Sequence, residues 1–574
     1  MEFAPWKHPA PLTQIFFPHP RRNPVFLRMF ANDKARTKKA FSTMAGNLKR
    51  KLPVSIQSFV EIRRRGYLYV DKTDIVWQLV NGVKFNYLSR PRRFGKSVLI
   101  DTLQAYFEGR RDLFEGLKIM QVMEEEWVAR PVLRLDMSRG GADADSIRSY
   151  LDLAFSRYET LYKVSVRPHS SLASRFDSII VAAYEQTGQQ VAILIDEYDS
   201  PLQHSWHTPE HEACTALYRE VFAILKADDE MERFVFITGI TKFTQISLFS
   251  VLNNLLNISF EPECATICGI SSQEIRDNFM PEVEQMAEAN GWTPEETLER
   301  LKAYYDGYHF CRHNMVDVYN PFSLINALYQ KELRSYWASS GSTSLLPKFV
   351  GDLEIHLCDF DHCRVFRDIL ETSDVTGGGP ELFLYQSGYL TIKSSDEFGY
   401  NLGIPNEEVR QALNQMVLPA LTLRKQGDIV SLQSNLYYQL GTGQLDEAKK
   451  SMRALIADVP YSNKKLASMD MEERYRLIIS TILNALGIRV EVERMLATGR
   501  IDLVAWLSRY IYVMELKLAS NGGLASAERQ IRECGYAEPF KADHRKVIAL
   551  AVELDSEGKG LVDWKVVEQC TRCN

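Results

Sequence analysis

Short apolar runs alternate with amphipathic stretches over the first half of the chain. A run that begins at Phe85 is the first of several strand-length apolar segments, and between them apolar residues recur every three to four positions. Alternating strands and helices are typical of a parallel sheet with helices on both faces. The pattern predicts further strands over 132–137, 191–195, 233–240 and 265–269, and helices over 145–162, 172–186 and 210–226.

The strand signals fade after residue 270. We expect residues 271–455 to be mainly helical, with one small hairpin made of 382–393 and 400–404. The last helices of this region are predicted over 407–423, 427–438 and 444–458.

The C-terminal part changes character again. One helix, three strands, a second helix and a further strand predict a separate α/β domain. These elements are expected over 472–486, 489–494, 501–507, 510–518, 524–534 and 546–552. The whole pattern therefore predicts an N-terminal extension over 1–44 and domains over 45–270, 271–455 and 456–574.

The composition is that of an ordinary globular protein long enough for several domains, with 574 residues, 45% hydrophobic and 25% charged. The net charge of −6 excludes no class of partner, because binding charge can be local. Nine cysteines without a regular framework favour a reducing compartment. No stretch approaches the roughly 18 apolar residues that span a bilayer. We therefore expect a cytoplasmic protein without a membrane segment.

Residues 1–43 are basic, poor in acids and rich in proline. Such a composition can mark an organellar transit segment, although the prolines disfavour the amphipathic helix that such a segment needs. Alternatively, translation begins at Met44. In both cases we expect no stable fold before about residue 50.

The stretch Arg90-Pro-Arg-Arg-Phe-Gly-Lys-Ser97 joins the first predicted strand to a helical pattern. A strand, a tight turn and a helix form the setting in which backbone N–H groups cradle phosphates. Lys96 would reach the β- and γ-phosphates of ATP, and the Ser97 hydroxyl would hold Mg²⁺. The pattern G-x-x-x-x-G-K-[ST] lacks its first glycine here, so a chance match is the alternative. The predicted ATP-binding residues are Arg92, Arg93, Phe94, Gly95, Lys96 and Ser97.

A second element supports a nucleotide site. The apolar run 191–195 ends in Asp196 and Glu197, and a buried parallel strand presents its carboxyl end to a ligand. Asp196 would then help to hold Mg²⁺, and Glu197 would polarise the attacking water. A solvated acidic turn is the bland alternative. Thr238 and Lys242, after the next strand, are weaker candidates for sensing the γ-phosphate.

Acids and a lysine converge in the C-terminal domain. Glu515 and Lys517 are two residues apart, so their side chains share one face of a strand. Asp502 would lie on the same face if the strands pair as a hairpin. Asp502 and Glu515 would bind a divalent metal, and Lys517 would orient or activate a water. A surface ion pair is the alternative reading.

Two blocks of sequence resemble known families. Leu52-Pro-Val-Ser-Ile-Gln-Ser-Phe, Tyr69-Val-Asp-Lys-Thr and the 90–97 stretch resemble the AAA-ATPase-like family of P-loop proteins, in which an arginine at position 90 is usual. Gly499-Arg-Ile-Asp502 with Glu515-Leu-Lys517 resembles the PD-(D/E)XK nuclease domain that commonly follows it. Together these resemblances cover about residues 45–555.

The resemblance implies further site residues and a function. Glu473 matches an acid of the preceding helix, Gln530 matches a glutamine of the following helix, and Glu493 is a competing acid. The implied fold is a P-loop NTPase sheet of the additional-strand class, a helical region and a restriction-endonuclease-like domain. We expect an ATP-hydrolysing protein coupled to Mg²⁺-dependent cleavage of nucleic acid, with DNA favoured over RNA, in defence or mobile-element biology. A second copy of the chain is a further candidate partner.

A different class of function stays open. The chain could be an ATP-dependent signalling switch or scaffold whose nuclease-like domain recognises nucleic acid or protein and cleaves nothing. A third possibility is that the nuclease fold is kept for recognition, while ATP hydrolysis is the only activity.

Overall fold

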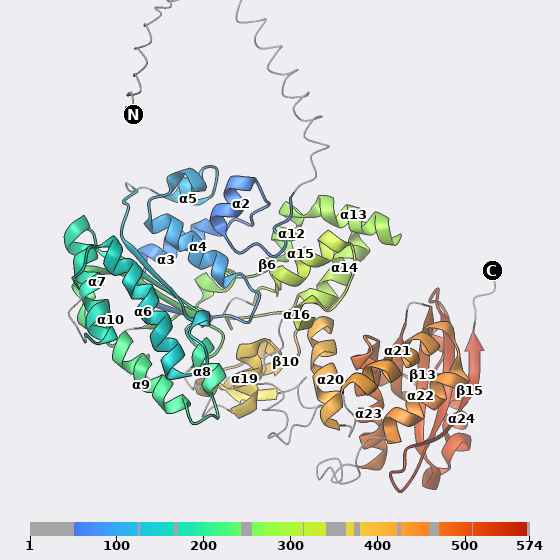
Figure 1. Ribbon diagram of the computed structural model, residues 1–574. Coiled ribbons are helices and arrows are strands. Elements are labelled where there is room, and N and C mark those ends of the chain that lie inside the picture. Colours follow the sequence, from blue (N-terminus) through green and yellow to red (C-terminus); the bar gives the residue numbers. More distant parts are fainter. Residues whose placement is uncertain are drawn as a thin grey trace, which may run out of the picture. The chain divides into compact units, whose positions relative to one another are not determined.

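The computed structural model in Figure 1 describes residues 51–123, 127–165, 170–242, 255–313, 315–339, 363–371, 379–421, 426–457, 470–507 and 509–570. The chain divides by its internal contacts into residues 1–51 and 52–574. The expected extension over 1–44 lies outside the described residues. Within the described ranges, no helix is long and apolar enough to cross a membrane.

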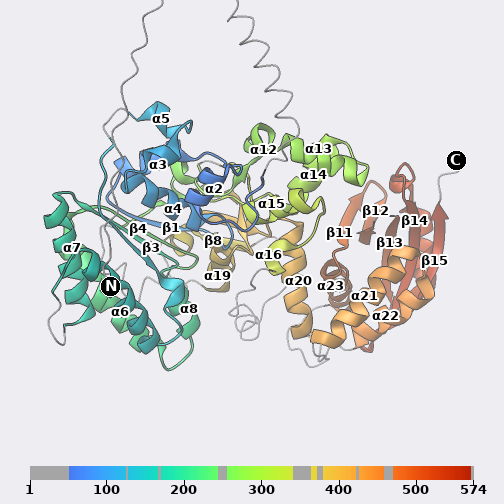
Figure 2. The ribbon, with the colours of Figure 1, turned by 45° about the horizontal axis from the view of Figure 1, so that its top comes forward.

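The first domain is built on a parallel sheet of five strands in the order β2-β3-β4-β1-β5. The strand β4 is inserted between the strand that precedes the 90–97 stretch (β1) and the strand that ends in Asp196 (β3), as the additional-strand class requires. In Figure 2 the helices α3 and α4 lie on one side of the sheet, and α6 and α7 on the other. The strands are β1 Phe85–Ser89, β2 Val132–Asp136, β3 Val191–Asp196, β4 Glu232–Gly239 and β5 Leu256–Asn257.

The helices of this domain follow the apolar periodicity of the sequence. For example, Ser171 caps α7 through its side chain, and Gly188 ends the helix in the left-handed conformation, as C-terminal glycines commonly do. The helices are α2 Phe59–Arg65, α3 Thr73–Asn81, α4 Lys96–Phe107, α5 Ile119–Val122, α6 Ala144–Leu161, α7 Leu172–Thr187, α8 Ser200–Ser205, α9 His211–Phe222 and α10 Ile224–Ala227.

The middle region is mainly helical, as the sequence predicts, and also contains the three-stranded antiparallel sheet β8-β10-β9. Capping boxes start α12 at Ser271 and α14 at Thr293. The elements are β6 Ile270–Ser271, α12 Ser272–Asn278, α13 Met280–Asn290, α14 Pro294–Tyr305, β7 Val318–Tyr319, α15 Pro321–Gln330, α16 Tyr336–Ser339, β8 Cys363–Phe366, α18 Arg367–Glu371, α19 Gly379–Ser387, β9 Thr391–Ser395, β10 Gly399–Gly403, α20 Glu407–Leu421, α21 Gln426–Thr442 and α22 Leu445–Ala457.

Two predicted strands are wrong. Residues 265–269 form turns after a short 3₁₀ helix, and residues 382–387 belong to α19. Both stretches are short and apolar with no polar alternation, and such runs do not distinguish a strand from a buried helix or turn. The predicted hairpin survives as β9 and β10 only. The end of the helix predicted over 407–423 and the last residue of the one over 444–458 lie outside the described residues.

Helix α20 is tied to the rest of the middle region by the buried Glu408. One of its carboxylate oxygens accepts hydrogen bonds from the Ser323 hydroxyl and from the backbone N–H groups of Tyr336 and Trp337, at 2.6–3.0 Å. Burial raises the pKa of Glu408 to about 7. This carboxyl therefore joins the beginning of α20 to α15 and α16.

A second buried acid lies at the opposite end of β4 from the 90–97 stretch. Glu232 is fully buried, and neither carboxylate oxygen has a hydrogen-bond partner among the described residues. Burial raises its pKa to about 9; the charges of Asp228 and Asp229 add to this rise, and that of Lys84 opposes it. The fold therefore favours the protonated form of Glu232.

The C-terminal domain is a five-stranded mixed sheet in the order β11-β12-β13-β14-β15, in which only β13 and β14 are parallel. Helices α22 and α23 pack on one face of it and α24 on the other. The strand β15 was not predicted. The elements are α23 Met471–Ala485, β11 Arg489–Leu496, β12 Gly499–Trp506, β13 Tyr510–Leu518, α24 Gly523–Cys534, β14 Lys546–Leu554 and β15 Leu561–Cys570.

Candidate nucleotide and nuclease sites

The turn before α4 has the conformation of a phosphate-binding loop. Gly95 has φ 94° and directly precedes α4, which begins at Lys96. The Lys96 ammonium donates to the backbone carbonyls of Arg90 and Pro91, at 2.8 and 3.1 Å. Burial lowers the pKa of Lys96, while the nearby carboxylates of Glu197 and Asp196 oppose this effect. The ammonium is thus held under the turn, next to two acids.

Arg90, in place of the first glycine, is a structural residue. Its guanidinium is buried and donates to the carbonyls of Ser89, Ser259 and Cys264 at 2.8–2.9 Å. It also lies over the Phe310 ring, 4.1 Å from the ring centroid. The side chain therefore fixes the start of the turn to the segment that follows β5.

Two other residues of the stretch are also held by aromatic contacts. Phe94 is buried, with its ring edge-on to those of Tyr308 and Phe310 at 4.8 and 5.4 Å. The guanidinium of Arg93 lies 4.7 Å from the centroid of the Phe322 ring on α15. Phe94 can therefore contact a nucleotide only through its backbone. The sequence alone did not show that its side chain is buried.

Ser97 and Asp196 come together at the end of β3. Both residues line one small polar cavity. Burial raises the pKa of Asp196, and the Lys96 charge and the Ser97 hydroxyl oppose the rise. A hydroxyl and a carboxylate that line the same cavity are ligand types that Mg²⁺ takes beside nucleotide phosphates. The residues present therefore fit the cation.

Glu197 follows in a left-handed conformation, with φ 48°. Burial raises its pKa, and the Lys96 charge again opposes the rise. The loop after it is held by Asp199, one of whose oxygens accepts from the backbone N–H groups of Ile240 and Thr241 at 3.0 and 2.6 Å. Asp199, which the sequence analysis did not single out, thereby ties the loop of Glu197 to the end of β4.

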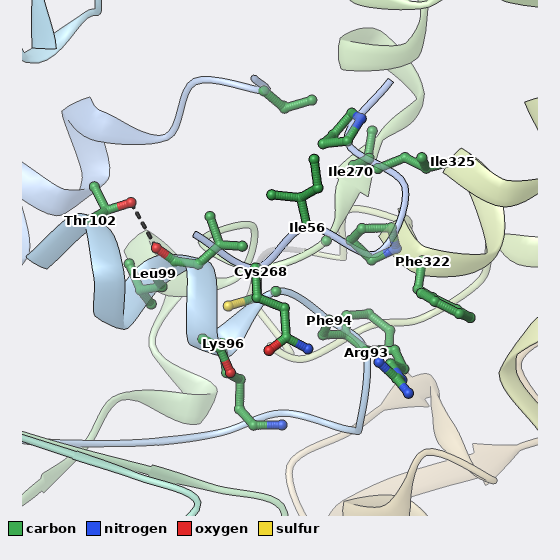
Figure 3. A pocket seen from close by; sticks show the side chains of 18 of the residues that line it. Ile56, Arg93, Phe94, Lys96, Leu99, Thr102, Cys268, Ile270, Phe322 and Ile325 are labelled. Carbon is green, nitrogen blue, oxygen red and sulfur yellow. Dashed lines mark hydrogen bonds between the residues drawn. The ribbon is translucent and has the colours of Figure 1, made fainter. Parts of the chain in front are cut away.

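A cavity of about 570 Å³ opens in front of the turn (Figure 3). Lys96 lies at one end, and Ile56, Ile270 and Ile325 gather at the other. A smaller polar cavity of about 220 Å³ adjoins it, because Ser97 and Glu197 line both. Asp136 lines this second cavity and is paired with Asp196 in the sheet register. The apolar walls from α15 and the carboxylate of Asp136 were missed because they come from distant parts of the sequence.

Thr238 and Lys242, the weaker candidates for sensing the γ-phosphate, have different surroundings. The Thr238 hydroxyl is buried with no hydrogen-bond partner in the described part of the chain. The Lys242 ammonium instead donates to the carbonyl of Glu371 in α18, at 3.2 Å. The structure therefore directs Lys242 to the middle region, and Thr238 remains a prediction.

The predicted nuclease residues meet where β12 and β13 separate. The pairing of these strands ends at Leu503 and Met514, one residue before Asp502 and Glu515. One oxygen of Asp502 accepts the backbone N–H of Leu516 at 2.9 Å, so the side chain replaces the missing strand contact. The side chains of Asp502 and Glu515 are both buried.

Glu515 and Lys517 form an ion pair with an N–O distance of 2.9 Å. Burial and the charge of Asp502 raise the pKa of Glu515 to about 7. Its second oxygen, Oε2, is buried and has no partner within the described ranges. An orphaned carboxylate oxygen beside Asp502 fits a divalent cation. No group of three or more His, Cys, Asp or Glu side chains with metal-binding geometry occurs among the described residues, so such a cation would need further ligands from water or substrate.

The helices around this site contribute differently from the prediction. Glu473 is exposed, whereas Glu472 accepts from the backbone N–H of Leu518 and from the Asn521 side chain, at 3.3 and 3.0 Å. The structure thus brings Glu472, not Glu473, to the end of β13. A helix pattern cannot distinguish two adjacent acids when neither position is apolar.

Gln530 is held by a tyrosine. Its side chain donates to the Tyr536 hydroxyl at 3.0 Å, and that hydroxyl donates to the carbonyl of Arg500 at 2.8 Å. Burial raises the pKa of Tyr536 to about 12, with the charge of Glu515 contributing. Gln530 therefore lies on the Glu515 side of the domain, connected to β12 through Tyr536.

Two family models and one relative match the chain. Residues 53–249 match the model described as predicted AAA-ATPase, and residues 470–564 match the PD-(D/E)XK nuclease superfamily. An uncharacterised protein in the vnfD 5′ region of Azotobacter chroococcum mcd 1 is 30% identical over 536 residues, which are 90% of this chain and 99% of that protein.

A comparison of folds found the structure of the Aeropyrum pernix ORC1 protein in complex with DNA. It is 12% identical and covers 62% of this chain and 91% of its own, with a TM-score of 0.21, which carries no argument about this protein. The family matches agree with the order of the domains and with the observed sheets. The chain therefore belongs to the family of AAA-ATPase-like proteins that carry a C-terminal PD-(D/E)XK nuclease superfamily domain.

Proposed function

We propose that the first domain binds and hydrolyses ATP and that the C-terminal domain cleaves nucleic acid with the help of a divalent cation. The placement of Ser97 and Asp196 around one cavity, with Lys96 buried beside them and a larger cavity in front, carries the first half. The meeting of Asp502, Glu515 and Lys517 where two strands separate supports the second.

In the ATP reaction the turn over 92–97 and the N-terminus of α4 would bind the phosphates through backbone N–H groups. Lys96 would place its charge beside the β- and γ-phosphates. Mg²⁺, held by Ser97 and Asp196, would neutralise phosphate charge. Glu197, whose pKa burial raises, would orient the attacking water and accept its proton.

The apolar end of the cavity would receive the base. Ile56, Ile270 and the α15 residues Phe322 and Ile325 come from three separate segments. They surround a space within the usual range for small-molecule sites, about 300–1,000 Å³. Because Phe322 and Ile325 belong to α15, a bound base would touch both the P-loop domain and the middle region.

In the nuclease site Asp502 and Glu515 would hold Mg²⁺, which supplies charge stabilisation to the phosphodiester transition state. Lys517 would position the attacking water. Although burial lowers the pKa of Lys517, its hydrogen bond to Glu515 outweighs this and keeps it charged. Gln530 would help to orient the same water or the substrate. Glu473 is exposed, so we assign it no role.

The ATPase proposal is tested by Lys96→Ala and Glu197→Gln, with the exposed Glu220→Gln as a matched control. Lys96→Ala should abolish ATP binding, measured with a fluorescent ATP analogue. Glu197→Gln should keep binding but lose at least about a hundredfold in phosphate release, as expected for a general base. Unchanged release in Glu197→Gln would contradict its role.

We further propose that ATP binding gates the nuclease, in the cytoplasm and with DNA as the preferred substrate, in defence or mobile-element biology. The covalent connection of the two domains supports this proposal. The competing function is a nucleotide switch that cleaves nothing, and it would show ATP binding without cleavage under any condition. The same proposal includes association of the chain with a second copy of itself.

A further inference from the structure

One arginine bridges the candidate metal ligand Asp502 and a second acid. Arg476, on α23, lies 3.1 Å through one terminal nitrogen from an oxygen of Asp502 and 3.1 Å through the other from an oxygen of Glu493. Its side chain is only 14% exposed. The sequence analysis did not identify it, because an arginine in an amphipathic helix is usually a solvated residue.

The second anchor, Glu493, adopts an unusual backbone conformation. It lies inside the edge strand β11 with φ 53°, a left-handed value that residues other than glycine rarely adopt. Its carboxylate reaches Arg476 and also Arg500, at 3.1 and 3.0 Å. Unusual backbone conformations of this kind persist where the surroundings hold them, often at functional sites.

A divalent cation that binds Asp502 would compete with Arg476 for the same carboxylate. One oxygen of Asp502 accepts from Leu516 N–H, and the other accepts from Arg476. A cation bound to Asp502 would therefore lie beside the guanidinium, which is also positively charged. The contact with Glu493 uses the other terminal nitrogen of Arg476, so it does not depend on the contact with Asp502.

We propose that Arg476 is a positioning residue with two alternative partners. Without a cation it neutralises Asp502; with a cation bound it stays on Glu493 and contacts a phosphate of the nucleic acid. The inference rests on the proposed nuclease function.

The chemistry of the side chain favours phosphate as the second partner. A guanidinium presents five N–H donors in a planar fork and is the preferred side chain for bidentate phosphate contacts. Arg476 uses two terminal nitrogens for two carboxylates, so release from Asp502 frees donors without removing its anchor. Arg500 shares the Glu493 anchor but makes no ion pair with Asp502 in the described structure.

The decisive variant is Arg476→Met, which removes the charge and keeps much of the apolar length. Mn²⁺ binding, measured by calorimetry on protein free of nucleotide and DNA, should tighten by roughly threefold to tenfold because a like charge near Asp502 is gone. Binding of a fluorescein-labelled DNA duplex in Ca²⁺, measured by anisotropy on DNA that a gel shows to be intact, should weaken by about tenfold.

Two other variants give matched comparisons. Arg500→Met removes the same charge from the same anchor and should change Mn²⁺ affinity by less than about twofold, because it does not touch Asp502. Arg476→Lys keeps the charge but cannot bridge two carboxylates and a phosphate. It should leave Mn²⁺ affinity within about twofold and weaken DNA binding by about threefold. It also keeps the test usable if the methionine variant fails to fold.

The opposite signs of the two changes distinguish this role from a structural one. Weakening of both Mn²⁺ and DNA binding in Arg476→Met would overturn the inference, since a disturbed fold lowers both. No change in either would overturn it too. Asp502→Asn fixes the baseline: if it and the wild type bind Mn²⁺ equally, the proposed metal site itself fails, which is a different result.

Discussion

Replacing Arg90 with glycine restores the phosphate-loop pattern, and we expect it to damage the protein. By sequence pattern alone, Arg90→Gly repairs a missing glycine. In the structure the guanidinium instead holds three carbonyls and lies over the Phe310 ring. Arg90 thus connects the loop before α4 to the segment after β5.

The magnitude follows from these contacts. Hydrogen bonds to a charged donor each contribute about 1.5–3 kcal/mol, and a desolvated cation–π contact about 2 kcal/mol. Burial lowers the pKa of Arg90, so desolvation of the charge offsets a large part of this gain. Removing the arginine leaves three carbonyl groups without this donor, at about 1–3 kcal/mol for each buried acceptor left unsatisfied, so a total of about 3–5 kcal/mol is expected. We expect a loss of that size in the free energy of unfolding.

The assay is urea unfolding with and without ATP. The quantity compared is the urea midpoint of the unfolding transition that ATP shifts to higher urea. Arg90→Gly should lower its midpoint strongly and weaken ATP binding as a secondary effect. Arg92→Ala is the matched control, because Arg92 lines the cavity and is only half-buried. It should weaken ATP binding and leave the midpoint nearly unchanged.

Improved or unchanged stability in Arg90→Gly, within about 1 kcal/mol, would refute the reasoning. The arginine would then be a tolerated replacement for glycine, and the observed hydrogen bonds would contribute nothing net.

Three further predictions concern two buried acids and one aromatic residue that lines the cavity. Glu408→Ala should lower the free energy of unfolding by about 2–4 kcal/mol in urea titrations, whereas Glu408→Gln should cost less than about 1 kcal/mol, since one oxygen accepts all three hydrogen bonds. The pKa of Glu232 is raised in the fold, so stability should fall as pH rises from about 4.5 towards about 9. Glu232→Gln should flatten that fall, measured by unfolding at pH 6 and pH 9, and an equally steep fall in the variant would count against it. Phe322→Ala should weaken ATP binding by about tenfold without a comparable loss of triphosphate binding, and equal losses for both ligands would exclude a base contact.

The elements that the sequence predicts best are those with a clear period and a chemical signal. The run from Phe85 to Ser97 folds as a strand, a turn and the start of a helix. The run that ends in Asp196 folds as a buried strand. Ser97 and Asp196 then meet because parallel strands present their carboxyl ends at one edge of the sheet. The predictions for Asp502, Glu515 and Lys517 follow in the same way from two adjacent strands.

The rest of the site depends on contacts between distant segments. The apolar walls from Ile56 and α15 carry no local signal, because an isoleucine or phenylalanine has the same sequence signature in a core and in a pocket. Arg476 and Glu472 depend on the rotation of α23, which a sequence with several adjacent charges does not fix. The strand prediction at α19 is wrong for a related reason, because residues 382–387 are buried on every side of the helix and show no amphipathic period.

The most direct test of the account is cleavage of single- and double-stranded DNA and RNA with Mg²⁺, with and without ATP. The wild type, Lys517→Ala and Lys96→Ala are compared, after each is shown to be folded. We predict cleavage of DNA by the wild type, none by Lys517→Ala, and a loss of the ATP effect in Lys96→Ala. Cleavage that persists in Lys517→Ala, or a wild type that binds ATP and cuts no substrate, would contradict the account.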